Sequence, residues 1–483
     1  MQVADLKSLS AGLPPLAVLC DFPFGPVDRI ASQLISAGVD VSIINLTTRI
    51  KAQSEYHELG SFRHVCGDEQ KNFQKLKVFQ TLFEKKHPAL DKSYDGYFFN
   101  FDLSLPLEKM EQVRKAGIFF VGPLRGLLPL FRLPGLLENK AGIMRLSDTQ
   151  PLSGYCLYTG GCRKWQTTGC ANCPQLGVAT TGRDECKEYF EKKLDAFASS
   201  ASNLTLVTPS SWLAEEARRS LIGKHLPSAS ITTSVELDLF RPHHQAVARR
   251  DLGLPEEEDV LLIGSAGLRK NKGFPLLCKA LSLLTGRWKK PPLLLFFGYA
   301  PSDTTLLDEA GIPWKALGWV GEPAQLARVY SAADVFVSPS FQDNLPNTVN
   351  EALACGTPVV CFDRFSSEEV VIDGVTGLKA RHPGLPLSPE GELRQAAPYE
   401  ATPEDCADLA EKILSLLSQG EDKRRILRRN CRKLAERSFS PTLQTARYLR
   451  TYRKMLGLSD ILISSLEQDQ DTLAADLTKI DFF

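Results

Sequence analysis

Residues 334–363 read DVFVSPSFQDNLPNTVNEALACGTPVVCFD. The apolar run at the start predicts a buried strand that ends at Ser-Pro-Ser, and the run from 358 predicts the next strand. Between them we expect a short helix that Asn347 caps and that Gly356 follows as the residue after the C-cap. In open α/β sheets, ligands lie beyond the carboxyl ends of strands and against helix N-termini, which favour phosphate. This stretch therefore predicts a parallel sheet with a ligand site at its edge.

Two carboxylates, Asp343 and Glu351, flank the start of this predicted helix. Glu351 is close enough to the helix start to bind two hydroxyls of a ribose, and Asp343 would accept hydrogen bonds from a sugar. A plainer alternative is that Glu351 complements the helix dipole and that Asp343 is a solvated loop residue. Two acids alone favour this alternative, so the decision depends on the sequence around them.

The bulk composition excludes several classes of protein. The chain has 483 residues, 43% of them hydrophobic, and its 57 Lys and Arg balance its 57 Asp and Glu. This length predicts two or three domains, and the zero net charge gives no electrostatic case for a nucleic-acid partner. The sequence holds no run of about 18 apolar residues and no cleaved-signal pattern, and its twelve cysteines are too few for a disulfide scaffold. These features favour a reducing cytoplasm.

Apolar runs alternate with helical patterns in two separate parts of the chain. Such β-α-β units at this spacing predict parallel sheets, so we expect two Rossmann-like, doubly wound α/β domains. The charged segment 239–259 has no apolar period and is typical of a linker. Buried strands are expected at 16–24, 39–46, 97–101, 117–122, 141–148 and 204–210, and again at 259–267, 293–298, 315–321, 334–340 and 358–363. The domain boundaries that we predict are 1–242, with a Cys-rich insertion at 151–176, then 243–440, a terminal helix at 441–457 and a tail at 458–483.

The stretch that begins at Asp343 resembles the donor site of the family-4 retaining glycosyltransferases. The motif of that family is Glu, seven residues and Glu, followed by Ala and a Cys-Gly-Thr-Pro-Val-Val turn; here Asp343 stands in place of the first Glu. GSAGLRKNKGFPLL at 264–277 is similar to the family's strand, loop and Lys-Gly helix start, and the resemblance extends over most of 200–455. It implies the GT-B fold, in which two Rossmann-like domains enclose a cleft and the terminal helix returns to the N-terminal domain.

The resemblance also implies an activity and roles for single residues. It implies retaining transfer of a sugar from a nucleotide diphosphate donor to a hydroxyl of a glycan, lipid-linked or polysaccharide acceptor, without a catalytic metal. Lys272 and Arg269 would neutralise the diphosphate, Glu351 would hold the ribose and Asp343 the sugar. Further donor contacts are expected from Gly25, Val320, Asn344, Leu345, Asn347 and Thr348.

The sequence departs from this family at one position that matters for activity. A subset of the family has His-Asp-x-Trp-Pro-Leu-Thr-Gly before a Cys-rich insertion, and here Ser147 replaces the His and Gln150 the Trp. The family His is thought to contact the donor sugar near the reacting carbon. A non-catalytic, sugar-nucleotide-binding homologue is therefore the alternative function.

Four cysteines lie close together in the insertion, at Cys156, Cys162, Cys170 and Cys173. A Cys-x2-Cys pair with two nearby thiols can supply four tetrahedral zinc ligands. A structural zinc site, reduced buried thiols and a disulfide pair are the three alternatives.

The apolar segment 121–137 has two interpretations. It could touch the inner face of a membrane, where lipid-linked acceptors lie. Its prolines favour a buried loop and short helix under the N-terminal sheet instead.

Overall fold

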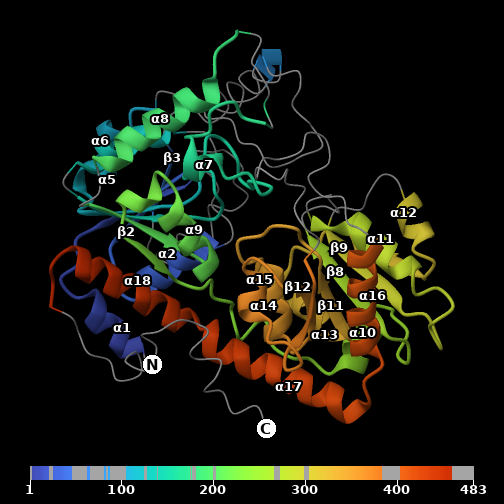
Figure 1. Cartoon of the computed structure of the whole chain (residues 1–483). Coiled ribbons are helices and arrows are strands. Elements are labelled where there is room, and N and C mark those ends of the chain that lie inside the picture. Colours follow the sequence, from blue (N-terminus) through green and yellow to red (C-terminus); the bar gives the residue numbers. More distant parts are fainter. Residues whose placement is uncertain are drawn as a thin grey trace. The chain divides into compact units, whose positions relative to one another are not determined.

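The computed structural model divides into two compact units. The first contains the chain up to Thr232 and the helix that begins at Pro441, and the second runs from Thr233 to Ser440 among the described residues. The labels of the elements are those of Figure 1. The structure describes residues 3–20, 26–45, 62–65, 81–82, 85–86, 105–124, 128–138, 140–174, 176, 181–199, 203–265, 272–298, 304–382 and 403–459.

The first unit is built on a parallel sheet of seven strands in the order β3-β2-β1-β4-β5-β6-β7. Its strands are β1 (Leu16–Cys20), β2 (Val41–Asn45), β3 (Phe62–Val65), β4 (Ile118–Val121), β5 (Ala141–Arg145), β6 (Leu204–Thr208) and β7 (Ser228–Ser230). Its helices are α1 (Val3–Ser10), α2 (Pro26–Ser36), α5 (Glu111–Lys115), α6 (Leu133–Leu137), α7 (Lys164–Thr167), α8 (Glu185–Ala198), α9 (Ser211–Arg219) and α18 (Pro441–Met455), with 3-10 turns η1 (Leu107–Lys109), η2 (Leu130–Arg132) and η3 (Gly223–His225).

Apolar side chains cover both faces of this sheet, as continuous buried strands require. One face packs against α1, α2 and α18, and the other against a cluster that includes α6, α8 and α9. Helix α18, the last described helix, belongs to this unit. The hydroxyl of its Tyr452 donates to the backbone carbonyl of Phe119 at 2.9 Å. The last long helix therefore belongs to the N-terminal core although it lies far away in the sequence.

The second unit repeats the plan with six parallel strands in the order β10-β9-β8-β11-β12-β13. Its helices flank the sheet, with α10, α13, α14 and α17 on one face and α11, α12 and α16 on the other (Figure 1). The strands are β8 (Val260–Ser265), β9 (Leu293–Gly298), β10 (Trp314–Ala316), β11 (Val335–Ser338), β12 (Val359–Phe362) and β13 (Gly377–Ala380). The helices are α10 (Gln245–Asp251), α11 (Phe274–Ser282), α12 (Thr305–Glu309), α13 (Pro323–Ala332), α14 (Asn347–Ala354), α15 (Ser367–Val370), α16 (Pro403–Leu417) and α17 (Glu421–Ser438).

The two α/β domains with parallel sheets confirm the predicted fold class. The expected strands that fall on described residues are present, but the one expected at 315–321 is shorter, because β10 ends at Ala316. The expected strand at 97–101 lies outside the described residues. Five leucines of the apolar segment 121–137 are buried: Leu124, Leu128, Leu130, Leu133 and Leu137 are at most 3% exposed. These leucines pack in the N-terminal core and present no surface to a membrane. In the described part of the chain, no helix has the length and apolar character needed to cross a bilayer.

The segment 239–259 is not a plain linker, because it contains helix α10. This helix packs against α13 and buries Arg249. The sequence does not predict the helix, because its few apolar residues show no helical period. The Arg249 guanidinium forms an ion pair with Asp334 at 2.6 Å, with the two side chains 6% and 9% exposed. It also donates to the backbone carbonyls of Ala332 and Glu256. Asp334 directly precedes β11, so this pair fixes the start of the strand that leads into the predicted site.

Replacing Arg249 by Met should lower the free energy of unfolding by roughly 3–5 kcal/mol, because it leaves a buried carboxylate without its main cationic partner. Arg287→Met is the matched control, since Arg287 pairs with Glu411 on the surface, where both side chains are about half exposed. That change should cost at most about 1 kcal/mol. Chemical denaturation measures both, and equal losses for the two variants would contradict a stabilising role for the Arg249–Asp334 pair.

Candidate functional site

The candidate site lies where the strand order of the second sheet reverses. Strands β8 and β11 are parallel neighbours, and the chain continues from β8 to one side of the sheet and from β11 to the other. Loops beyond the carboxyl ends of two such strands diverge and leave room for a ligand. Lys272 follows β8 and Asp343 follows β11, so both predicted residues lie at this edge.

Gly273 brings the two loops together. Its backbone has a φ of +72°, and a Cβ atom at this position would lie 1.8 Å from the backbone oxygen of Pro339. Only glycine permits both the left-handed conformation and this close approach. Helix α11 begins immediately after Gly273, directly against the end of β11. The Lys-Gly sequence is therefore required by backbone packing as well as by the charge of the lysine.

Lys272 and Asp343 form an ion pair with each other. The Lys272 Nζ donates to Asp343 Oδ2 at 2.5 Å, and the two side chains are 24% and 12% exposed. The sequence predicted separate roles for them, the lysine on a diphosphate and the aspartate on a sugar. Pairing offsets the cost of holding a carboxylate away from water, and it means that an incoming anion competes with Asp343 for the lysine.

The loop after Asp343 is held in a strained conformation by Ser366. The Ser366 hydroxyl donates to the backbone oxygen of Asp343 at 2.8 Å and accepts from the backbone N–H of Leu345. Leu345 has a φ of +83°, which is unfavourable for a side chain of this kind. Asn344 is buried, and its backbone N–H donates to Asp343 Oδ1 at 2.9 Å. Ser366 lies beyond the next strand, and the sequence analysis did not identify it.

Helix α14 begins one residue earlier than expected. Pro346 occupies the N-cap position and Asn347 is the first helical residue, so the prediction that Asn347 caps the helix is wrong. Proline has no side-chain acceptor, and no side-chain hydrogen bond from the cap residue covers the first N–H groups. Thr348 lies in the same first turn. An uncapped N-terminus at the carboxyl edge of a parallel sheet is suited to an anion.

The other end of α14 is closed as predicted. Gly356 follows the C-cap with a φ of +75°, its N–H donates to the carbonyl of Leu353, and the N–H of Thr357 donates to Ala352. These two bonds form the Schellman motif that glycine favours. The prediction for Gly356 is therefore confirmed.

Glu351 is oriented by a buried tyrosine. The Tyr330 hydroxyl on α13 donates to Glu351 Oε2 at 3.0 Å, and the Tyr330 ring packs against Phe240, Phe297 and Phe336. Burial and the negative charge of Glu351 raise the pKa of Tyr330 well above its ordinary value, so the hydroxyl stays a proton donor. Sequence reasoning missed Tyr330, because its apolar neighbours give it the pattern of an ordinary core residue.

A tight turn after β10 completes this edge of the sheet. The Gly318 carbonyl accepts from the N–H of Gly298 at 2.8 Å, and Gly318 has a φ of +69°. Val320, an expected donor contact, packs partly buried against the core. Its neighbour Trp319 is 68% exposed, and its indole lies over Gly321. An indole is well suited to stacking on a flat ring, so Trp319 is a functional candidate that the sequence analysis did not single out.

Three further predicted positions do not add a described contact to this edge of the sheet. Gly25 and Arg269 are outside the described residues. Ser147, in the first unit, accepts a hydrogen bond from the Arg145 guanidinium at 2.6 Å. A guanidinium thus lies next to the position where the family pattern has an imidazole.

The expected cysteine ligands are only partly brought together. Among the described residues, all cysteines are free thiols, so the disulfide alternative is wrong there. Cys173 is within hydrogen-bonding distance of Cys156, but Cys162 instead accepts from the backbone N–H of Lys164. In the ranges that the structure describes, no group of three or more His, Cys, Asp or Glu side chains has the arrangement of a formed metal site.

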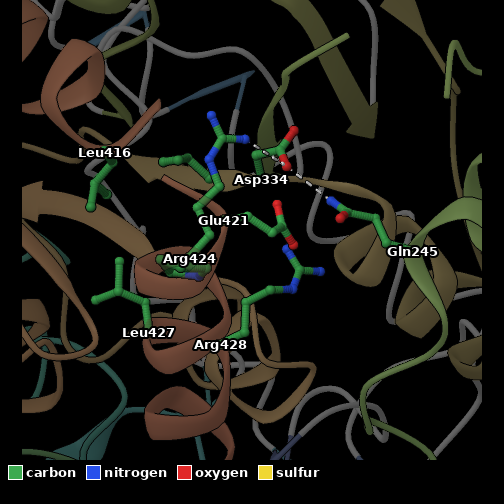
Figure 2. Close-up of a pocket in the computed structure, with 9 residues that line it drawn as sticks. Gln245, Asp334, Leu416, Glu421, Arg424, Leu427 and Arg428 are labelled. Carbon is green, nitrogen blue, oxygen red and sulfur yellow. Dashed lines mark hydrogen bonds and ion pairs between the residues drawn. The ribbon is translucent and has the colours of Figure 1, made fainter. Parts of the chain in front are cut away.

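A pocket at the opposite edge of the second sheet belongs to the packing of the domain and is not a candidate ligand site (Figure 2). It contains Asp334, whose carboxylate accepts from Gln245 at 3.0 Å, from the backbone N–H of Val260 at 2.7 Å and from Arg249, and lies 3.5 Å from Arg424. Its acceptors already have donors, so they are poorly placed to bind a ligand. The lining residues are Gln245, Asp334, Val335, Pro358, Leu416, Glu421, Arg424, Leu427 and Arg428.

The sequence of the second unit matches a known family. Residues 257–419, which contain Lys272, Asp343 and Glu351, match the family model described as Glycosyl transferases group 1. This segment is similar to the group 1 glycosyltransferases. The chain is 33% identical over 157 residues to a D-inositol 3-phosphate glycosyltransferase of Segniliparus rotundus, a match that covers 31% of this chain and 34% of that protein. It is 28% identical over 244 residues to a putative teichuronic acid biosynthesis glycosyltransferase of Bacillus subtilis, which covers 48% of this chain and 58% of that one.

Solved structures match over nearly the whole chain. A sucrose-phosphate synthase from Thermosynechococcus elongatus has a TM-score of 0.59 at 19% identity, covering 92% of this chain and 100% of that one. Anabaena HepE, solved in complex with UDP and glucose, has a TM-score of 0.56 at 13% identity, covering 91% and 100%. At these identities the likeness shows the fold, which is GT-B.

Gly273→Ala should destabilise the protein by more than about 1 kcal/mol beyond the cost of its left-handed backbone, because the added methyl meets the Pro339 carbonyl. Gly286→Ala is the matched control, since Gly286 has a φ of +80° but nothing within 4 Å of an added Cβ. Thermal and urea denaturation of the two variants measure the difference. Equal destabilisation would show that the approach to Pro339 imposes no constraint.

Proposed function

We propose that this protein is a retaining glycosyltransferase that moves a sugar from a nucleotide diphosphate donor to an acceptor hydroxyl. The observation that carries the proposal is Glu351, which Tyr330 holds at 3.0 Å beside the uncapped start of α14 and within the segment that is similar to the group 1 glycosyltransferases. A fixed carboxylate next to a free helix N-terminus matches a ligand that has vicinal hydroxyls and phosphates.

The donor would bind along the carboxyl edge of the second sheet. The ribose hydroxyls donate to Glu351, the diphosphate lies against the N–H groups at Asn347 and Thr348, and the base stacks on the exposed indole of Trp319. UDP is the nucleotide that was found in Anabaena HepE, which supports a nucleoside diphosphate at this edge. The acceptor is a glycan, lipid-linked or polysaccharide hydroxyl.

Donor binding would rearrange the Lys272–Asp343 pair. The diphosphate offers Lys272 a stronger anion than one carboxylate, so the lysine turns toward the phosphates and Asp343 becomes available to accept from a sugar hydroxyl. The residue that pairs with the lysine before binding is thus the residue that contacts the sugar after it. This exchange places positive charge near the phosphates only when they are present.

The reaction needs no protein nucleophile. The bond between the anomeric carbon and the diphosphate oxygen breaks, and the nucleoside diphosphate leaves with the electron pair. The acceptor oxygen forms its bond on the same face of the sugar, and its proton passes to the departing phosphate oxygen. Lys272 and the N-terminus of α14 stabilise the charge that develops on the leaving group, so this charge stabilisation comes from the protein itself.

A second candidate function is supported by Ser147. In place of an imidazole, this position presents a hydroxyl that already accepts from Arg145 at 2.6 Å. A hydroxyl in this setting cannot exchange a proton near neutral pH as a histidine does. A homologue that binds sugar nucleotides without transferring the sugar fits this substitution.

Glu351→Ala should weaken donor binding at least tenfold, because it removes the acceptor of the ribose hydroxyls and leaves the Tyr330 hydroxyl buried without its partner. Titration calorimetry with UDP-, GDP- and ADP-sugars, after a thermal-shift screen, measures this effect. Glu411→Ala, a surface change in the same unit, should leave the affinity unchanged. Wild-type protein that binds none of these nucleotides would contradict the proposed function.

Release of nucleotide separates the two functions. Transfer predicts that a bound donor is consumed, with faster release of nucleoside diphosphate when an acceptor is added. Donor binding that Glu351→Ala abolishes, with no release from any donor, would favour the non-catalytic alternative.

A further inference from the structure

Four thiols from three segments of the first unit lie together at the start of α8. Cys156 follows β5, Cys170 and Cys173 lie on one turn, and Cys186 is in the first turn of α8. Cys173 is within hydrogen-bonding distance of Cys156 and of Cys186, and Cys186 also contacts Cys170. Cys156, Cys170 and Cys186 are each at most 9% exposed, so water has little access to them.

The backbone around these thiols is built for close contact with sulfur. Gly154 donates its N–H to Cys170 Sγ at 3.2 Å, and a Cβ at Gly154 would lie 2.3 Å from Cys186 Sγ. Backbone N–H donors of this kind stabilise sulfur in its thiolate form. A methyl group added at 154 would displace the Cys186 sulfur, and the Gly154 N–H is aimed at the cluster.

A second set of contacts fixes the turn that holds Cys170 and Cys173. Cys170 and Asn172 both have positive φ values, of 61° and 51°. The Asn172 N–H donates to Asp184 Oδ2 at 2.6 Å, and the other oxygen of Asp184 caps α8 through the N–H of Lys187. The same carboxylate therefore links the Cys-x2-Cys turn to the start of the helix that carries Cys186.

A fully buried lysine lies next to the cluster. Lys193 is 0% exposed, and its Nζ donates to the backbone carbonyls of Gln150, Ser153 and Gly154. Among the described residues it forms no ion pair within 4.0 Å, while Cys170, Cys186, Cys156 and the Asp148 carboxylate are close enough to act on its charge. A buried ammonium is costly unless an anion compensates it, and neutral thiols supply no such charge.

We propose that Cys156, Cys170, Cys173 and Cys186 bind one zinc ion as a structural site and that Lys193 is its counter-ion. Binding releases the four thiol protons and forms a tetrathiolate complex of net charge −2, which Lys193 partly neutralises. The sulfurs move from hydrogen bonds with one another to a common metal centre. Cys162, which the sequence placed in the ligand set, stays outside it because its sulfur is engaged by the N–H of Lys164.

The ligand set is tested by zinc analysis of the full-length protein. Wild-type protein should contain about one zinc per chain, Cys186→Ser should lose it, and Cys162→Ser, as the matched control, should keep it. Lys193→Met should still be purified with zinc. Its affinity for zinc, measured by competition with a chelator, should be roughly tenfold or more below that of wild-type protein, as expected for a group outside the ligand shell. Wild-type protein that holds no zinc and takes up none would overturn the proposal, and so would loss from Cys162→Ser with retention in Cys186→Ser.

A second measurement covers the case in which Cys186→Ser fails to fold. Wild-type protein stripped of metal and titrated with Co²⁺ should develop the strong sulfur-to-metal charge-transfer and tetrahedral ligand-field bands of a thiolate site, and the same spectrum should appear in Cys162→Ser. A weak spectrum typical of oxygen ligands would overturn the site. Neither measurement requires the protein to bind or transfer a sugar.

Discussion

The contact of Gly273 with the Pro339 carbonyl is the constraint on which the proposed donor site depends. Because glycine alone tolerates this approach, α11 can begin directly against the end of β11. Lys272 then comes within 2.5 Å of Asp343, although the two are 71 positions apart in the sequence. The loops of the two central strands are thereby joined at the switch point of the sheet, where doubly wound folds bind their ligands.

The carboxylate on the far side of this junction is held equally firmly. Tyr330 is enclosed by three aromatic rings and donates to Glu351, and the helix that carries Glu351 is anchored by Asn350, whose side chain donates to the Thr233 carbonyl at 3.2 Å. Ser366 adds a third support by holding the strained loop at Leu345. The described parts of the site thus owe their positions to buried packing and backbone bonds, as a preorganised binding site requires.

Local sequence patterns predicted the fold and part of the site. Apolar runs located the strands, and the acids with the Lys-Gly pair located the edge of the sheet that carries them. The supports could not be predicted in this way, because Tyr330 and Ser366 act through three-dimensional contacts that no short motif encodes. Helix α10 was missed since one of its two buried residues is an arginine, and Asn347 was misplaced since Pro346 takes the capping position. Cys186 lies beyond the tight cysteine spacing, and only the packing of α8 brings it to the other thiols.

The central claim is that Glu351 recognises the ribose of a nucleotide donor. The most direct measurement compares the affinities for a ribonucleoside diphosphate and its 2′,3′-dideoxy analogue in wild-type protein and in Glu351→Gln. The account predicts that wild-type protein prefers the ribonucleotide at least tenfold, about 1.4 kcal/mol, and that the variant shows little preference. Equal affinity of wild-type protein for both ligands, or the same preference in the variant, would contradict it.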